Sequence, residues 1–271
     1  MHASRSVDVA RRTLNHMPRL KHTDWPDRLW IVRHGQSAGN VARADALRAD
    51  AHLIDLETRD ADTPLSELGH RQSAALARWF ASLPEHERPT TLMSSPFVRS
   101  RQTMEAVASA LGTPHDEVLV DERLREKEFG ITDGYTTAGI AAKFPELAEQ
   151  RARVGKFYFR APGGESWCDV ILRLRSVVEV LRRDYVGERV LIVAHQVIVN
   201  CFRYLLECMD EAQILEIDRK ADVPNCSVTA YAIDRQAADP RFELQVANLE
   251  LPLEEAGVQA TGAADRPAGP R

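Results

Sequence analysis

Long apolar runs are missing from this sequence. No stretch approaches the roughly 18 consecutive apolar residues of a transmembrane helix, so we expect no membrane span and no membrane partner. The N-terminal residues, MHASRSVDVARRTLNHMPRLKH, also lack the apolar core of a secretory signal peptide. They are rich in arginine, as transit peptides are, but Asp8 and the short apolar stripe argue against a transit peptide. We therefore expect a cytoplasmic protein.

Cysteine is scarce, and its spacing matches no known metal or redox motif. The chain has four cysteines, with no C-x-x-C pair and no zinc-like spacing. All four lie in apolar surroundings, which predicts buried free thiols in a reducing compartment. They are Cys168, Cys201, Cys208 and Cys226. We expect neither a metal nor a cofactor.

Lysine is also rare, with 5 lysines against 30 arginines, and the formal net charge of the chain is −5. A mildly acidic chain does not suggest nucleic-acid binding, so an anionic ligand would need a local positive pocket. Base composition of the genome can explain the arginine excess. Alternatively, a few guanidinium groups bind an oxyanion, because arginine can donate two hydrogen bonds to it in parallel.

The elements that are present alternate between strands and helices. Strands are expected at 28–33, 90–94, 117–120, 190–194, 226–233 and 242–248, with helices from 66, after 97, at 166–185 and after 195. This alternation predicts an α/β protein with a mostly parallel central sheet. We expect one domain over 28–250, after an N-terminal extension, 1–27. The Ala-, Gly- and Pro-rich end, 251–271, is expected to be a disordered tail.

Polar side chains follow three of these strands where each strand ends. Arg33 and His34 follow the first strand, Ser95 follows the second, and His195 follows the strand at 190–194. Ligands of parallel sheets bind at the carboxyl ends of the strands, so we expect these residues to converge. A neutral imidazole can attack phosphorus, and arginines stabilise the charge of the transferring phosphoryl group.

Each of these residues has an ordinary structural interpretation when taken alone. A histidine at a strand end can be a hydrogen-bonded structural residue, and Arg99 can be a solvated helix residue. Glu126 lies in a run of charged residues typical of a protein surface. No single residue therefore decides the function.

Five ordered segments together carry a resemblance. They are Arg33-His-Gly-Gln-Ser-x-x-Asn40, Thr63-Pro-Leu-Ser-Glu-Leu-Gly-His-Arg-Gln72, Ser94-Ser-Pro-Phe-Val-Arg-Ser-Arg-Gln-Thr103, Leu124-Arg-Glu-Lys-Glu-Phe-Gly130 and Val190-Leu-Ile-Val-Ala-His195. In this order they resemble the motifs of the histidine phosphatase superfamily, which includes the phosphoglycerate mutases. The resemblance covers roughly residues 28–235 and implies a phosphoglycerate mutase-like three-layer α/β/α sandwich.

The resemblance also implies roles for individual residues. His34 is the nucleophile that becomes phosphohistidine, and Glu126 is the proton donor. His195 is the third catalytic residue and, with Arg33 and Arg99, surrounds the phosphate. The implied phosphate-binding residues are Arg33, Ser37, Asn40 and Arg99, with no metal. Glu128 is a competing carboxylate. Two residues apart in an extended segment, Glu126 and Glu128 point in opposite directions, so only one should face the site.

The segment 156–166 and the pair His195-Gln196 resemble the fructose-2,6-bisphosphatase domain and, more closely, the fungal and plant broad-range acid phosphatases. This resemblance implies substrate contacts for Lys156 and Gln196. Arg160 belongs to the same basic and aromatic segment and is a further candidate for binding a distal anion. Asn200 and Thr137 replace an arginine and a tyrosine of the bisphosphatase, which argues against fructose bisphosphate as the substrate.

These observations predict a phosphomonoester hydrolase that acts through phosphohistidine, without a metal, on a small phosphorylated metabolite. The alternatives are a phosphoglycerate mutase and a catalytically inactive phosphate-binding module. The mutase motif around the proton donor is absent, and all four central positions are filled. The sequence identifies neither the substrate nor the oligomeric state.

Overall fold

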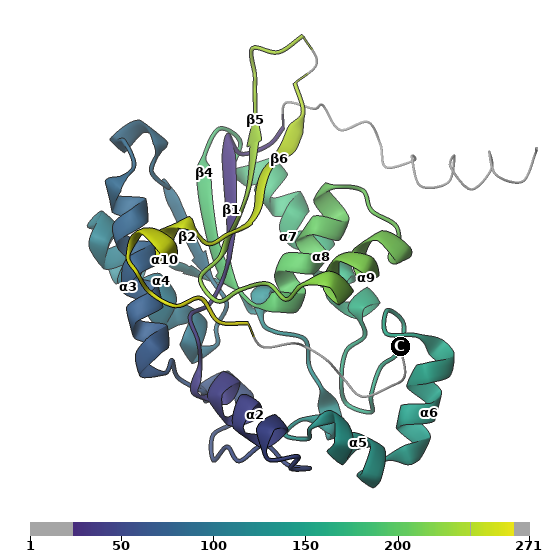
Figure 1. Ribbon diagram of the computed structural model, residues 1–271. Coiled ribbons are helices and arrows are strands. Elements are labelled where there is room, and N and C mark those ends of the chain that lie inside the picture. Colours follow the sequence, from purple (N-terminus) through teal and green to yellow (C-terminus); the bar gives the residue numbers. More distant parts are fainter. Residues whose placement is uncertain (1–23, 239, 263–271) are drawn as a thin grey trace, which may run out of the picture.

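The computed structural model describes residues 24–238 and 240–262, and within them the chain forms a six-stranded sheet (Figure 1). The strand order is β3-β2-β4-β1-β5-β6. The strands are β1 (Arg28–Arg33), β2 (Thr91–Ser94), β3 (Leu119–Val120), β4 (Arg189–Ala194), β5 (Val228–Ile233) and β6 (Phe242–Leu249). Strands β1 to β4 are parallel, whereas β5 and β6 are antiparallel to their neighbours. The predicted mostly parallel sheet is confirmed.

Helices cover both faces of this sheet. One face carries α3 (Glu67–Ser82), α4 (Val98–Leu111) and α10 (Leu251–Glu255), and the other carries α7 (Trp167–Asp184), α8 (Gln196–Leu206) and α9 (Glu211–Lys220) (Figure 1). Alternate residues of β1 face opposite sides, so Leu29 and Ile31 pack in one core and Trp30 and Val32 in the other. The expected three-layer α/β/α sandwich is confirmed.

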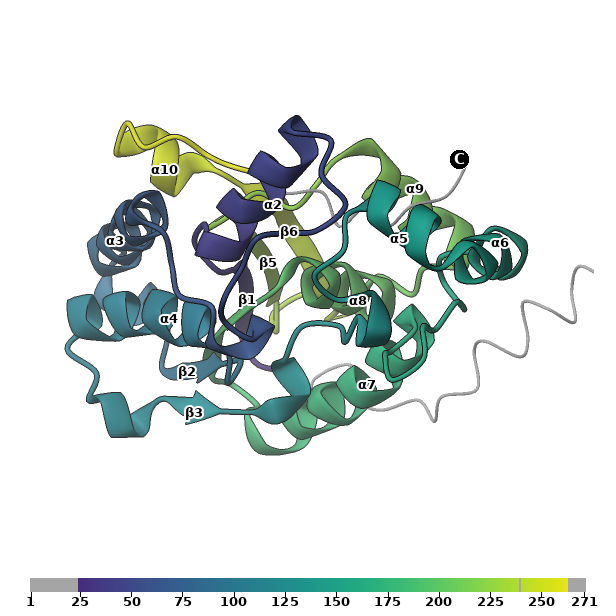
Figure 2. The ribbon, with the colours of Figure 1, turned by 90° about the horizontal axis from the view of Figure 1, so that it is seen from below.

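Three further helices lie beyond the carboxyl ends of the parallel strands, at the bottom of Figure 1. They are α2 (Ala38–Arg48), α5 (Thr137–Lys143) and α6 (Pro145–Val154). Figure 2 views the molecule from this side, with the segment that joins α2 to α3 running in front of the strand ends. These additions enclose the edge of the sheet where the ligand is expected.

The helix boundaries follow from capping. The hydroxyl oxygen of Ser66 accepts the amide of Gly69 at the start of α3, and Gly112 ends α4 in the left-handed conformation. Ser166 and Asp169 form a reciprocal capping box at the start of α7. Its predicted apolar stripe is buried, including Trp167 and Leu174.

Three expectations from the sequence need correction: the length of β3, the burial of the cysteines, and the disorder from residue 251 onward. Strand β3 is only Leu119–Val120, because Pro114 leads into a short 3-10 turn at His115–Glu117. Cys208 is exposed and Cys168 is half-buried, although all four cysteines are free as expected.

The predicted disorder from residue 251 is wrong over residues 251–262. Leu253 of α10 is fully buried in the core beside α3. The side-chain amide nitrogen of Gln72 donates to the carbonyl oxygen of Gln259 and to the hydroxyl of Thr261. Burial of an apolar side chain and these hydrogen bonds outweigh the entropy of ordering the segment. Residues 263–271 and 1–23 of the predicted extension lie outside the described residues. No helix in the described part of the chain is long and apolar enough to span a membrane.

Candidate active site

The ends of β1, β2 and β4 bring the predicted residues together. Arg33 lies opposite Ala194 in the β1–β4 register, and the amide of His34 donates to the carbonyl oxygen of Ala194 at 2.9 Å. The ring centroids of His34 and His195 are 5.1 Å apart. The expected convergence of these strand ends is therefore observed.

Close backbone packing shapes the turn after β1. A Cβ on Gly69 would lie 1.9 Å from the carbonyl oxygen of Gln36, and a Cβ on Gly35 would lie 2.6 Å from that of Gly69. Only glycine at both positions lets the start of α3 press against the turn. This contact fixes the backbone that carries His34.

The hydrogen bonds of His34 define its protonation. Its Nδ1 lies 2.6 Å from the carbonyl oxygen of Gly35, which only accepts, so Nδ1 carries the proton. Arg99 donates from Nε to Nε2 of His34 at 3.2 Å. Burial, followed by the charges of Arg99 and Arg33, lowers the pKa of His34 well below 6.5 against the opposing bond to Gly35. His34 is therefore a neutral imidazole with its lone pair on Nε2.

His195 is held from the second strand. Its Nε2 lies 2.8 Å from the hydroxyl oxygen of Ser95, while its buried Nδ1 has no hydrogen-bond partner among the described residues. Burial, then the charges of Arg99 and His34, lower its pKa well below 6.5. A buried nitrogen without a partner is costly, and an oxygen of a bound anion would satisfy it.

Two buried arginines lie beside the histidines. Arg33 donates from Nη1 to Oε1 of Gln196 at 2.9 Å, so these two predicted residues are in contact. Arg99, which is 4% exposed, extends from α4 to His34. Both arginines lie against the sheet edge and supply positive charge where an oxyanion would bind.

Ser37 and Asn40 form a capping box at the start of α2. The hydroxyl oxygen of Ser37 accepts the amide of Asn40, and Oδ1 of Asn40 accepts the amide of Ser37 at 3.0 Å. The side-chain NH₂ of Asn40 is the donor that remains for an anion. Ser37 lines the site but uses its oxygen to start the helix.

A cavity of about 310 Å³ opens over these residues, apart from His195, which does not line it. Glu126 lines it together with Arg33, His34, Asn40 and Arg99, whereas Glu128 does not line it. The Glu128 side chain is half exposed, and its carboxylate lies 3.6 Å from the Arg125 guanidinium. Glu126, and not Glu128, therefore faces the cavity.

The family model described as the histidine phosphatase superfamily (branch 1) matches residues 29–244. The chain belongs to this superfamily.

Curated relatives of the chain include a bisphosphatase and a probable mutase. The chain is 29% identical to a 6-phosphofructo-2-kinase/fructose-2,6-bisphosphatase of Caenorhabditis elegans over 223 residues. This aligned region covers 79% of this chain and 43% of that protein. The chain is also 29% identical over 173 residues to the probable phosphoglycerate mutase GpmB of Photorhabdus laumondii, covering 64% of this chain and 71% of that protein. The chain thus spans less than half of the C. elegans relative.

Solved structures give the same family and fold. A mycobacterial glucosyl-3-phosphoglycerate phosphatase in complex with VO₃ has a TM-score of 0.61 and 28% identity, over 83% of this chain and 100% of that one. An alpha-ribazole phosphatase of Shigella flexneri has a TM-score of 0.63 and 21% identity, over 82% of this chain and 96% of that one. At this identity the likeness shows the fold alone.

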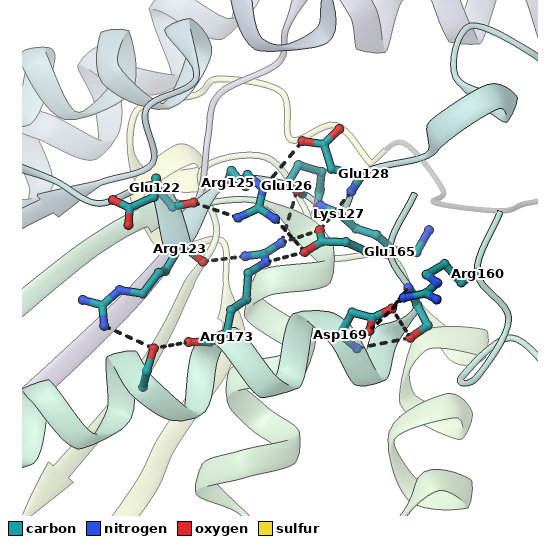
Figure 3. A network of polar contacts seen from close by, with 12 residues as sticks. Glu122, Arg123, Arg125, Glu126, Lys127, Glu128, Arg160, Glu165, Asp169 and Arg173 are labelled. Atoms are coloured by element: carbon teal, nitrogen blue, oxygen red, sulfur yellow. Dashed lines mark hydrogen bonds and ion pairs between the residues drawn. The ribbon is translucent and has the colours of Figure 1, made fainter. Parts of the chain in front are cut away.

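A cluster of charged residues holds the segment that carries Glu126 (Figure 3). Glu165 accepts hydrogen bonds from Arg125 at 2.8 Å and from Nε of Arg173 at 2.9 Å, and it also accepts the amide of Glu128. Arg173 further donates to the backbone carbonyl oxygens of Arg123 and Glu126.

Burial of Glu165 opposes its ionisation. The hydrogen bonds and charge of Arg173, the Glu128 amide and the charge of Arg125 outweigh burial and hold its pKa below 4.5. These hydrogen bonds hold the backbone in place on both sides of Glu126.

The two cations predicted to bind the substrate, Lys156 and Arg160, lie in different places relative to the cavity. Lys156 lines the cavity, where its ammonium lies 2.6 Å from the Asp218 carboxylate and over the ring of Trp167. Arg160 does not line it: its side chain is 63% exposed and pairs with Asp169 at 3.7 Å. The structure therefore brings Lys156 but not Arg160 to this cavity, and their spacing in the sequence alone did not reveal the difference.

Sequence reasoning missed several cavity residues. Arg43 lies three positions after Asn40 on α2, and helical spacing could have placed it on the same face. Asp60 and Asp133 line the cavity from loops that belong to no motif. Asn225 does not line the cavity, but it was missed as well: it is fully buried and its side chain donates to the carbonyl oxygen of His34 at 2.9 Å. Among the described residues, no group of three or more His, Cys, Asp or Glu side chains could hold a metal ion.

Proposed function

We propose that this protein hydrolyses phosphomonoesters of a small phosphorylated metabolite in the cytoplasm, without a metal, through a phosphohistidine on His34. The observation that carries this proposal is the hydrogen bonding of His34: its Nδ1 lies against the carbonyl oxygen of Gly35, which can only accept, so the lone pair is assigned to Nε2 beside Arg99. A neutral imidazole with a fixed tautomer is the form that can attack phosphorus.

The reaction has two steps. Nε2 of His34 forms a bond to phosphorus as the bond from phosphorus to the ester oxygen breaks, and Glu126 gives its proton to the leaving alkoxide. The Glu126 carboxylate then takes a proton from water, whose oxygen attacks phosphorus and releases His34 and inorganic phosphate. Arg33, Arg99 and the donor nitrogen of Asn40 would bind the phosphoryl oxygens throughout.

The cavity supports a small substrate. Its volume of about 310 Å³ lies at the lower end of small-molecule sites. The relatives named above include a fructose-2,6-bisphosphatase and a glucosyl-3-phosphoglycerate phosphatase, whose names specify phosphorylated sugars or sugar acids. A phosphorylated sugar or sugar acid is therefore the substrate class to screen first.

The lowered pKa of His34 predicts activity at acid pH. A histidine whose pKa lies below 6.5 stays neutral, and therefore nucleophilic, as the pH falls to that lower pKa. Hydrolysis is expected to persist below pH 6.5 and to decline only when His34 becomes protonated. The pH dependence of kcat/KM checks this expectation.

The decisive experiment is His34→Ala assayed with p-nitrophenyl phosphate. We expect a loss of about 10³-fold or more, because the nucleophile is removed. His70→Ala, a histidine exposed on α3, is the matched control and should retain activity. Vanadate should inhibit the wild-type protein and EDTA should not. Hydrolysis that survives His34→Ala would refute the proposal, and efficient transfer between 2- and 3-phosphoglycerate would favour a mutase.

A further inference from the structure

A carboxylate lies on the arginine that the proposed reaction needs for phosphate. Asp60, in the 3-10 turn Asp60–Asp62, contacts both terminal nitrogens of Arg99. Oδ1 of Asp60 is 3.1 Å from Nη1, Oδ2 is 3.2 Å from Nη2, and the backbone carbonyl oxygen also accepts from Nη1. The pair therefore has the two-pronged geometry in which arginine binds an oxyanion.

Arg99 uses its third nitrogen on the candidate nucleophile, since Nε donates to Nε2 of His34. Every guanidinium nitrogen is thus engaged: one with His34 and two with Asp60. A phosphoryl group bonded to Nε2 of His34 would bring its oxygens next to these same nitrogens. Phosphate and carboxylate are alternative ligands of one guanidinium.

The two partners differ in how firmly they are held. The Arg99 side chain is buried, whereas that of Asp60 is 39% exposed and belongs to a short turn over the cavity. Asp60 can therefore turn toward solvent at a smaller structural cost than Arg99. A second carboxylate, Asp133, lines the same cavity, where burial and then the charge of Asp60 raise its pKa. Negative charge already present in the cavity opposes an incoming dianion.

We propose that Asp60 is an internal anion that occupies Arg99 in the resting protein and that a phosphoryl group must displace. Asp60 thereby weakens the binding of phosphate and favours release of the product. The inference rests on the proposed function in one respect only, the binding of a phosphoryl group at Arg99.

The experiment measures the Kd of inorganic phosphate for the full chain by isothermal titration calorimetry. Asp60→Asn keeps an oxygen beside Arg99 but removes the charge. We expect phosphate to bind about tenfold more tightly, because the Asp60 carboxylate no longer competes with phosphate for the Arg99 guanidinium. Asp60→Ala should change the Kd in the same direction, and thermal unfolding shows whether either variant is folded.

Asp62→Asn is the matched control. Asp62 lies in the same turn but pairs with Arg59 at the surface and does not line the cavity, so its Kd should equal that of the wild type. Unchanged or weaker binding by both folded Asp60 variants would overturn the proposal and leave Asp60 as a residue that positions Arg99. If neither the wild type nor these variants bind phosphate, the proposal also fails, whereas the His34→Ala assay judges the proposed function separately.

Discussion

The two ends of the cavity are built in different ways. The inner end consists of buried side chains at the ends of β1, β2 and β4, where Arg33 and His34 are each 3% exposed. The outer wall comes from the segments 54–60 and 127–161, and it includes Asp60, Asp133 and Lys156. The inner end is thus fixed by sheet register, and the outer wall by contacts between loops.

This difference suggests a division of labour. Residues on a rigid scaffold can hold the reacting atoms in place, which phosphoryl transfer requires. Residues on loops can change without disturbing the sheet, so the outer wall is the part suited to select the group attached to phosphate. Substitutions at the inner end should therefore lower kcat, while those at the outer wall should alter KM or Kd.

Among the substitutions that compare the inner end with the outer wall, the largest effect is expected at Glu126, whose carboxylate lines the cavity between the two. Glu126→Gln keeps the shape of the side chain but removes the proton donor, so kcat for phenyl phosphate should fall by about 10²-fold or more. The loss should be smaller for p-nitrophenyl phosphate, because p-nitrophenolate leaves without needing a proton. Steady-state kinetics with both esters measure this difference.

Glu128→Gln is the matched control for that prediction. Glu128 is half exposed, does not line the cavity and lies 3.6 Å from Arg125, so its loss should leave both rates nearly unchanged. The opposite result, with Glu128→Gln alone discriminating between the two esters, would show that the proton donor was assigned to the wrong carboxylate.

A smaller effect is expected from the cluster that holds the Glu126 backbone. Glu165→Gln removes the charge that pairs with Arg173 and Arg125, which should let the 123–128 segment move. We expect kcat for phenyl phosphate to fall by about 10-fold, and p-nitrophenyl phosphate to be affected less, because misplacing a reacting group slows catalysis.

Hydrogen exchange gives a second measurement for this variant. The amide of Glu128, which donates to Glu165, should exchange faster in Glu165→Gln. Glu179→Gln, on the same α7 helix as Arg173, serves as the control. Equal losses with both esters and unchanged exchange would mean that Glu165 does not position Glu126.

The sequence predicted the inner end far better than the outer wall. Strand ends in a parallel sheet meet by topology, so Arg33, His34 and His195 could be brought together without knowing any loop. Whether Lys156 or Arg160 faced the cavity depended on one turn, and Asp60 reached Arg99 from a segment with no regular pattern. The ordered residues 251–262 were missed because low-complexity composition hid a buried leucine and a few specific hydrogen bonds.

The smallest effect separates two cations of the outer wall. Lys156 lines the cavity, whereas Arg160 lies outside it and is largely exposed. Lys156→Ala should raise KM by about 5- to 10-fold for monoesters with a second anionic group, such as 3-phosphoglycerate, because a charge-assisted contact is lost. It should leave KM for phenyl phosphate nearly unchanged, since that ester has no distal charge. Arg160→Ala should change neither constant. If Arg160→Ala instead raised KM for the doubly charged ester, the outer wall would have to extend beyond the cavity, and the division between a fixed inner end and a selective outer wall would need to be redrawn around the 155–161 turn.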